Sequence, residues 1–375
     1  SGVAKARLVR ARALARTGRI GECESELDVA LTAARAADDR RRVAAVLGAA
    51  PVAALWGPSP IPRAGGRCLD VVRLLRITGG SPAVEATSTR CQAVLEALRG
   101  RFETARSMLA EARTTVEEVG LSHGLLETEF YAGIVELLAG DPDAAEPRLR
   151  DAFDGLDRLG LGADAGHVAA YLARALLRLG RIDDADEFAR AAERQAGQNP
   201  QTGISARAVR AEVSERSGDL DEAVELARAA VEMAAATDLV VDHADASAVL
   251  ALVAEAAGDI PTAKRARRDA AVLAEHKGAT SAVATASAPA DVLESAAPTY
   301  PPGSGCVVVD RAATDPGADV AFPASIGRRV LGTLQGSISL AELRGDDGFH
   351  RFAVEELDRA GEPTRVTLFA PTTSA

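Results

Sequence analysis

The side chains that could carry catalysis are scattered along the 375-residue chain. The sequence contains no phosphate-binding G-x-x-x-x-G-K-[ST] loop, no zinc-binding H-E-x-x-H pair and no G-x-S-x-G nucleophile elbow. Adjacent carboxylates occur at Asp183–Asp184 and Asp346–Asp347, where helix-dipole and turn preferences explain them without chemistry. The sequence therefore predicts no catalytic residue and no cofactor for this segment.

Histidine and cysteine residues also lack the spacing of a metal site. Zinc sites usually contain close pairs such as C-x-x-C, and disulfide frameworks need a high density of cysteines. Here the candidates are far apart, so we expect buried free thiols, a reducing cytoplasm and no bound metal. The residues concerned are His123, His167, His243, His276, His350, Cys23, Cys68, Cys91 and Cys306.

Composition excludes several classes of protein. The formal net charge of −11 argues against nucleic-acid binding over the whole surface, and the basic run Lys264–Arg268 is interpreted as a solvated helix face. No stretch of about 20 residues is free of charge, so we expect no membrane span, and no secretory signal is present. Only three of the 43 basic residues are lysine, which indicates a GC-rich bacterial genome. The chain starts at Ser1 in a helix-like segment, which suggests a fragment of a longer polypeptide.

Glycines that precede an alanine-rich segment recur about every 40 residues. Small or apolar residues lie seven and five positions before them, and alanine recurs five and twelve positions after them. Positions +5, +9 and +12 lie on one stripe of a helix, where alanine lets two helix axes approach closely. Each unit is therefore expected to be a helical hairpin that covers its apolar face by stacking on its neighbours. The repeat-packing residues are Gly18, Gly57, Gly100, Gly140, Gly180, Gly218, Gly258, Ala105, Ala145, Ala185, Ala223 and Ala263.

This pattern resembles the tetratricopeptide repeat over roughly residues 3–278. The clearest copy contains Ala173, Gly180, Ala185 and Ala192. The period departs from the ~34 residues of that family, and the proline that usually closes a unit is missing. Longer helices are the simplest explanation for the extra residues. The resemblance implies a superhelix of about seven antiparallel hairpins over residues 1–278.

The segments Leu95–Leu121 and Val135–Gly160 look like the C-terminal helical region of large actinobacterial signalling proteins. In that family a class III nucleotide cyclase or a helix-turn-helix regulator accompanies a P-loop ATPase. The resemblance implies a regulatory segment rather than the catalytic one.

The tail has a different composition. Residues 279–304 are rich in Ala, Ser, Thr and Pro and indicate a linker. Residues 305–375 show strand-like patterning, so the expected fold class is mainly α, a solenoid followed by a small β-rich domain. The last hairpin weakly resembles polyketide-cyclase-like cone domains, possible hosts of a small-molecule site. In that alternative, the acid–base candidates are Asp310, His350 and Glu355.

In tetratricopeptide-like arrays, the first helix of each hairpin lines the concave face. The family geometry selects a groove that is basic in its first half and acidic in its second. The alternative is that these are solvated charges on an exposed helical face. The predicted groove residues are Arg12, Arg90, Phe130, Arg174, Glu212 and Glu215, and the same offsets select Leu137, Leu177 and Glu255.

We therefore expect a non-catalytic interaction and regulatory module of a cytoplasmic signalling protein. Its expected partner is a protein, a peptide or the upstream catalytic domain of the same chain, and not a membrane or a nucleic acid. A sensor segment of an ATPase-type transcriptional regulator is one alternative, and a small-molecule or enzymatic cone-like tail is another.

Overall fold

The structure, a computed structural model, describes residues 2–78, 80–197 and 199–279, together with the backbone of five segments beyond residue 305; side chains of residues 76–79 are not described. The chain divides into two compact units, Ser1–Ala290 and Asp291–Ala375. Each unit is considered by itself.

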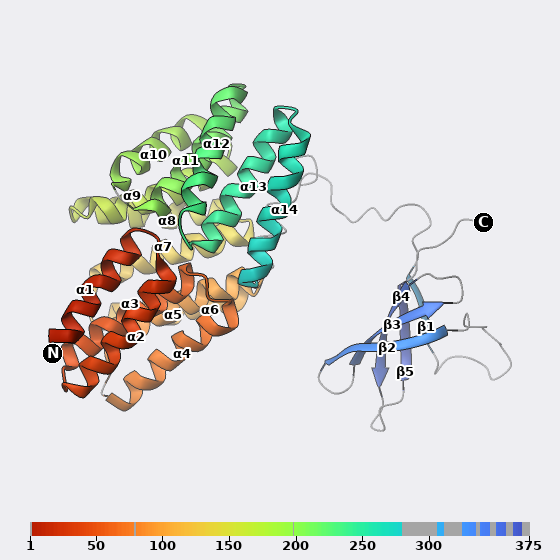
Figure 1. The fold of residues 1–375 in the computed structure, drawn as a ribbon, viewed down its shortest axis with the longest axis horizontal. Helices are drawn as coiled ribbons and strands as arrows, with labels where there is room; N and C mark the ends of the chain where they lie inside the picture. The colour runs from red at the N-terminus through yellow and green to blue at the C-terminus, as the bar shows by residue number, and fades with distance from the viewer. Residues whose placement is uncertain are drawn as a thin grey trace. The chain divides into compact units, whose positions relative to one another are not determined.

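The described part of the first unit consists of fourteen helices, and consecutive helices pack as antiparallel hairpins in a solenoid (Figure 1). Each helix before the last hairpin also packs on the first helix of the next hairpin, so a continuous core runs along the array. The helices are α1 Gly2–Arg16, α2 Ile20–Ala36, α3 Arg40–Trp56, α4 Ile61–Thr78, α5 Pro82–Leu98, α6 Phe102–Glu118, α7 Ser122–Ala139, α8 Pro142–Arg158, α9 Gly162–Arg178, α10 Ile182–Ala196, α11 Pro200–Arg216, α12 Leu220–Ala235, α13 Val240–Ala256 and α14 Ile260–Lys277.

Helix length explains the long period. Helices α5 to α9 contain 17 or 18 residues each, and short turns separate them. Two such helices and two turns account for a period near 40 residues.

Small side chains lie where neighbouring helices meet. Ala105, Ala145, Ala185 and Ala223 have no exposed surface, and Ala263 is 1% exposed. Because these alanines face the preceding helix of their own hairpin, a larger side chain would separate the two axes.

The turns within the hairpins adopt two backbone conformations. Gly140 ends α7 in the left-handed conformation at φ +79°, as expected for a residue without a Cβ atom. Gly57 instead has φ −80° and ψ −175°, so it does not adopt the left-handed turn. The cause is Pro58, since the residue before a proline is driven into extended backbone.

Aspartate begins three of the second helices. Asp141 accepts a hydrogen bond from the backbone N–H of Ala144, and Asp219 and Asp259 make the same contact three residues downstream. Such caps satisfy a backbone donor that the first turn leaves free, and each contributes about 1 kcal/mol.

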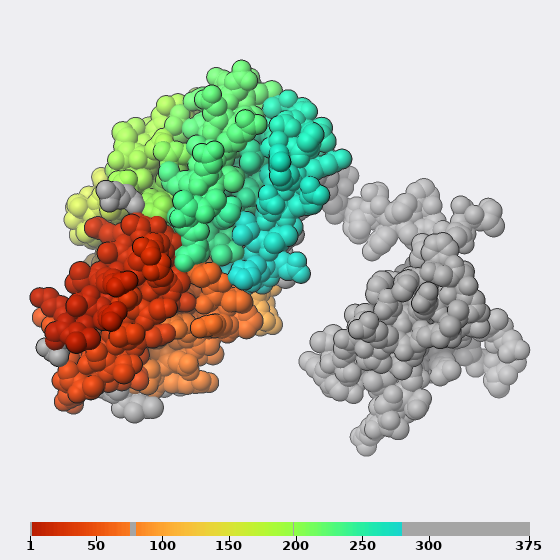
Figure 2. All heavy atoms as spheres, viewed as in Figure 1, coloured from red at the N-terminus to blue at the C-terminus, as the bar shows by residue number. Residues whose placement is uncertain are grey.

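The two ends of the solenoid contact each other. Asp238, before α13, accepts hydrogen bonds from the backbone N–H groups of Ile20 (2.5 Å) and Gly21 (2.8 Å) at the start of α2. Its own N–H donates to the carbonyl of Gly18 at 3.0 Å. The space-filling view shows the N-terminal hairpin against this green segment (Figure 2).

A second contact between the ends involves Lys277 on α14. Its ammonium group is fully buried and donates to the carbonyls of Ala54 (3.2 Å), Gly57 (2.7 Å) and Ser59 (2.9 Å) at the end of α3. Burial lowers the pKa of Lys277 to about 8. We call the Asp238 and Lys277 hydrogen bonds the closure contacts, because they join the last hairpins to the first two.

The expected fold class needs correction, because it added a small β-rich domain to the solenoid. Residues 2–279, as far as they are described, contain fourteen helices and no strand, so the established fold is a helical repeat solenoid alone. Beyond residue 305 the backbone forms strands in the antiparallel order β1-β5-β4-β3-β2, but no core is described for them. Their bounds are β1 Cys306–Asp310, β2 Ser325–Leu334, β3 Ile338–Gly345, β4 His350–Leu357 and β5 Pro363–Phe369.

Candidate functional site

Two chambers lie inside the solenoid, lined mainly by the first helix of each hairpin. The wide chamber has a volume of about 760 Å³, and its lining includes Arg12, His123, Phe130 and His167. The narrow chamber has a volume of about 190 Å³, and its lining includes Leu98, Tyr171, Arg174, Glu212, Asp242 and Asp245. Ligand sites of drug size usually measure about 300–1,000 Å³, so the wide chamber suits a chain segment and the narrow one a single side chain.

Aromatic rings concentrate in the wall that the chambers share. Trp56 lines both chambers. The Phe130 ring lies edge-to-face with Tyr131, His167 and Tyr171, at centroid distances of 5.6, 5.2 and 5.3 Å. Aromatic residues make up only 3% of the chain, so this grouping on three inner helices is a distinctive feature of the lumen.

A buried polar contact crosses the same wall. Gln201, which lines the wide chamber, donates a hydrogen bond of 3.2 Å to the carboxylate of Asp242 in the narrow chamber. His167 lies 3.0 Å from the hydroxyl of Thr202 through Nδ1. Burial lowers the pKa of His167 to about 4, so this histidine is neutral near pH 7.

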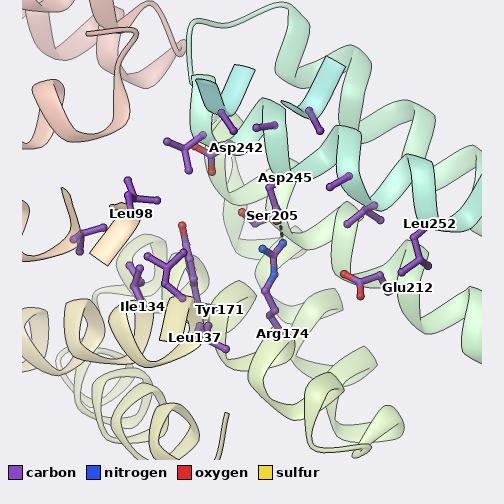
Figure 3. Close-up of a pocket in the computed structure, with 18 of the residues that line it drawn as sticks. Leu98, Ile134, Leu137, Tyr171, Arg174, Ser205, Glu212, Asp242, Asp245 and Leu252 are labelled. Carbon is purple, nitrogen blue, oxygen red and sulfur yellow. Dashed lines mark hydrogen bonds and ion pairs between the residues drawn. The ribbon is translucent and has the colours of Figure 1, made fainter. Parts of the chain in front are cut away.

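Helices α9, α11 and α13 supply the charges of the narrow chamber (Figure 3). Arg174 of α9 forms an ion pair with Asp245 of α13, and the close-up shows this pair across the middle of the chamber. Burial raises the pKa of Glu212 and is the main cause that raises the pKa of Asp242 to about 7. Both carboxyl groups are therefore poorly solvated.

The inner helices are fastened to one another by arginines. Arg90 is 1% exposed and donates to the Gly124 carbonyl and the Thr128 hydroxyl, and forms an ion pair with Glu127 at 2.6 Å. Burying an arginine costs free energy unless its charge and donors are matched. Here the ion pair and the hydrogen bonds satisfy the two terminal nitrogens, whereas Nε has no hydrogen-bond partner among the described residues. Arg90 therefore holds α5 against α7 and is not available to a ligand.

A further arginine contact recurs between hairpins. Arg178 donates to the carbonyl of Leu137 at 2.7 Å, and Arg216 donates to the carbonyl of Leu177 at 2.6 Å. In both cases the arginine lies two residues before a helix-ending glycine and reaches the end of the preceding inner helix. The shared spacing of these arginines is a signal that the sequence offered.

The predicted groove residues are divided among different surroundings. Arg12 and Phe130 line the wide chamber, whereas Arg174, Glu212 and Leu137 line the narrow one. The others do not line either chamber. Arg90 lies between helices, Leu177 is 1% exposed, Glu255 pairs with Arg267 at the rim, and Glu215 is half-buried outside both chambers.

Sequence reasoning missed several residues of the lumen. Trp56, His167, Gln201, Asp242 and Asp245 line it but were not selected. The single tryptophan of the chain was an available signal, because a large ring near the end of an inner helix is unusual in a core built from alanine. The two aspartates gave none, because acidic side chains are common on exposed helix faces.

The described residues provide groups for binding rather than for a recognisable reaction. Among them no three His, Cys, Asp or Glu side chains are grouped as a metal site would require. No helix in the described part of the chain has the length and apolar character needed to cross a membrane. The side chains of the tail candidates Asp310, His350 and Glu355 lie outside the described residues.

Comparison with known proteins supports a repeat assignment. A tetratricopeptide-repeat family model matches residues 4–28, 166–191 and 204–229. No curated protein matches the sequence significantly.

Solved structures with a similar fold share little sequence identity with this chain. A Rap protein complexed with Competence and Sporulation Factor has a TM-score of 0.59 and 14% identity, covering 72% of this chain and 75% of its own. Apo RapI has a TM-score of 0.51 and 11% identity, covering 73% and 98%. NprR in complex with its cognate peptide NprX has a TM-score of 0.51 and 10% identity, covering 75% and 82%.

At these identities the likeness shows the fold alone. Together, the matched repeats, the fourteen helices and these structures show that the described part of the chain is a tetratricopeptide-like helical repeat region.

Proposed function

We propose that this chain is a non-catalytic interaction module that binds a peptide segment of its partner inside the solenoid. The observation that carries the proposal is the wide chamber, about 760 Å³ in volume and lined by charged, amide and aromatic side chains. The combination of aromatic rings with a few polar groups is typical of binding sites. Two solved structures of this fold, those of Rap and NprR, are complexes with a signalling factor and a cognate peptide, which supports a peptide as the occupant.

We also propose that the module regulates a larger cytoplasmic signalling protein with a nucleotide cyclase or an ATPase. The support is the sequence resemblance of Leu95–Leu121 and Val135–Gly160 to such proteins. The upstream reading frame of the gene tests this part of the proposal. A cyclase or phosphate-loop sequence there would support it, and an unrelated frame with its own stop codon would contradict it.

The test of peptide binding uses the full chain and a phage library of random heptapeptides. Ala15 lies on α1 and lines the wide chamber, whereas Ala13 on the same helix is exposed and lines neither chamber. Ala15→Trp should reduce binding of the selected peptides at least tenfold, because the indole fills the chamber. Ala13→Trp should leave their affinity unchanged. Selected peptides that bind both variants as well as the parent would refute the proposed site.

A further inference from the structure

The narrow chamber has one wall of carboxylates and another of hydrocarbon. Asp242 and Asp245 of α13 and Glu212 of α11 supply the acidic groups. The apolar part of the lining comes from α5 and α7, with Leu98, Ile134 and Leu137 labelled in the close-up (Figure 3). Val94 and Leu138 of the same two helices also line the chamber.

The charges of this chamber are only partly compensated within the chain. Arg174 is matched by Asp245, and Arg267 is matched by Glu255. Among the described residues, neither Asp242 nor Glu212 has a cationic group within ion-pair distance. Arg178 also lines the chamber and lies within electrostatic range of Glu212, but it donates to the Leu137 carbonyl and forms no ion pair with either carboxylate.

Of the two unpaired carboxylates, Asp242 is better placed than Glu212 to bind a cationic ligand. It is 5% exposed, and Gln201 is the one side-chain donor that the described residues provide for it. In the close-up the hydroxyl end of Tyr171 points toward Asp242, and Ser205 lies nearby (Figure 3). No hydrogen bond to either hydroxyl occurs within the described residues, so both remain free to contact a ligand.

We propose that the narrow chamber is a specificity pocket for a lysine side chain of the peptide, and this inference rests on the proposed function. The ammonium group would donate hydrogen bonds to Asp242, with the hydroxyls of Tyr171 and Ser205 as further acceptors. The four methylene groups would lie along Leu98 and Ile134. A volume of about 190 Å³ admits one side chain of this kind, while the rest of the peptide lies in the wide chamber beyond Trp56.

The electrostatic surroundings of Asp242 agree with an unfilled cation site. Burial and then Asp245 raise its pKa to about 7, whereas Gln201 and Arg174 act in the opposite direction. Lys277 lies within electrostatic range, but its ammonium group is already bound by three backbone carbonyls. A ligand ammonium group would therefore give Asp242 the ion-pair partner that it lacks among the described residues.

The first experiment examines the chamber without a peptide. Hexylammonium, hexanol and hexanoate share one hydrocarbon chain and differ in charge, and their binding to the full chain is measured by ligand-observed NMR titration. Hexylammonium should bind at least tenfold more tightly than hexanoate, since an ammonium group can donate hydrogen bonds to the Asp242 carboxylate and a second carboxylate cannot. Equal binding of the three probes, or tighter binding of hexanoate, would overturn the proposal.

Variants locate the ammonium group. Asp242→Asn keeps an oxygen that can accept from Gln201 and should reduce hexylammonium binding about tenfold, and Tyr171→Phe should reduce it less. Asp157→Asn removes an exposed carboxylate that lines neither chamber and should leave binding unchanged. Circular dichroism spectra identical to the parent's show that each variant is folded. Binding by Asp242→Asn as tight as that of the parent would overturn the assignment.

The second experiment uses peptides selected from the heptapeptide library. Replacing their lysine by norleucine should weaken binding about tenfold in the parent and less than twofold in Asp242→Asn. Acetylation of the peptide N-terminus should have no effect, and a loss on acetylation would assign the pocket to the terminal amine instead. If no peptide is selected at all, the proposed function fails, whereas the hexylammonium series still decides the chemistry of the chamber.

Discussion

Gly133 offers the sharpest test of how closely the hairpins nest. It lies on α7, seven residues before Gly140, where the other repeats have alanine. A Cβ atom at this position would lie 2.4 Å from Cγ of Leu149 on α8. Leu149 has no exposed surface, so it has no free space into which it could move. We therefore expect Gly133→Ala to destabilise the protein.

Two opposing effects determine the size of this change. Alanine in place of glycine within a helix contributes about 1 kcal/mol of stability. An extra methyl group in a well-packed core costs about 1–3 kcal/mol, and the upper end applies here because the contact is about 1 Å too short. The net loss in the free energy of unfolding is therefore about 2 kcal/mol.

Gly66 provides a matched control within α4, because a Cβ atom there would meet nothing within 4 Å. Gly66→Ala should raise stability by about 1 kcal/mol, since only the helix-propensity effect remains. Urea denaturation followed by circular dichroism measures both variants against the parent. Equal or greater stability of Gly133→Ala would refute the packing argument.

A double-mutant cycle assigns the loss to the proposed contact. Leu149→Ala removes the atoms that the new methyl group would meet and itself costs about 2–5 kcal/mol. In that background Gly133→Ala should no longer destabilise. A loss of about 2 kcal/mol that persists without the leucine would show that another contact is responsible.

Three further predictions concern buried polar groups. His167 has a pKa of about 4 in the folded protein, below its value in the unfolded chain, so the unfolded state binds more protons. The free energy of unfolding should therefore fall by roughly 3 kcal/mol as the pH drops from 6.5 to 4. His167→Gln should flatten this part of the curve of stability against pH. Asp238→Ala removes the acceptor of the Ile20 and Gly21 N–H groups and should lower the free energy of unfolding by about 1–2 kcal/mol. Hydrogen exchange at the start of α2 should become faster, and unchanged exchange there would contradict the closure contact. Arg90→Met should lower stability by several kcal/mol in thermal melts, because it leaves Glu127 and two acceptors on α7 without their partner. A variant as stable as the parent would show that the arginine is dispensable.

The sequence predicted the hairpins because their signal is local and repeated. Ala145 and Ala185 occupy equivalent positions forty residues apart, and both are fully buried. Aspartate caps such as Asp141 and Asp219 are local in the same sense, since an N-cap depends only on residues within one turn. Where the local context changes, as at Gly57 before a proline, the turn conformation departs from that of the other repeats.

The lumen could not be predicted in the same way. Asp238 and Lys277 bind backbone groups about 220 residues away in the sequence, and such contacts leave no periodic trace. The groove residues and their charges were predicted from positions that line the concave face in the tetratricopeptide-repeat family. Those positions did not indicate that Arg90 is buried between two helices or that Asp242 is buried.

Closure changes what the lumen can do as a binding site. A chamber whose walls are already joined loses little conformational freedom when a ligand binds, so more of the contact energy appears as affinity. The closure contacts are hydrogen bonds between charged side chains and backbone groups, so opening the ring requires breaking them. Differential binding of a peptide to the closed form would shift the balance between open and closed forms further toward the closed one. Because Asp238 and Lys277 connect the last hairpins to α2 and α3, we expect a ligand held in the chambers to stabilise both ends of the solenoid together.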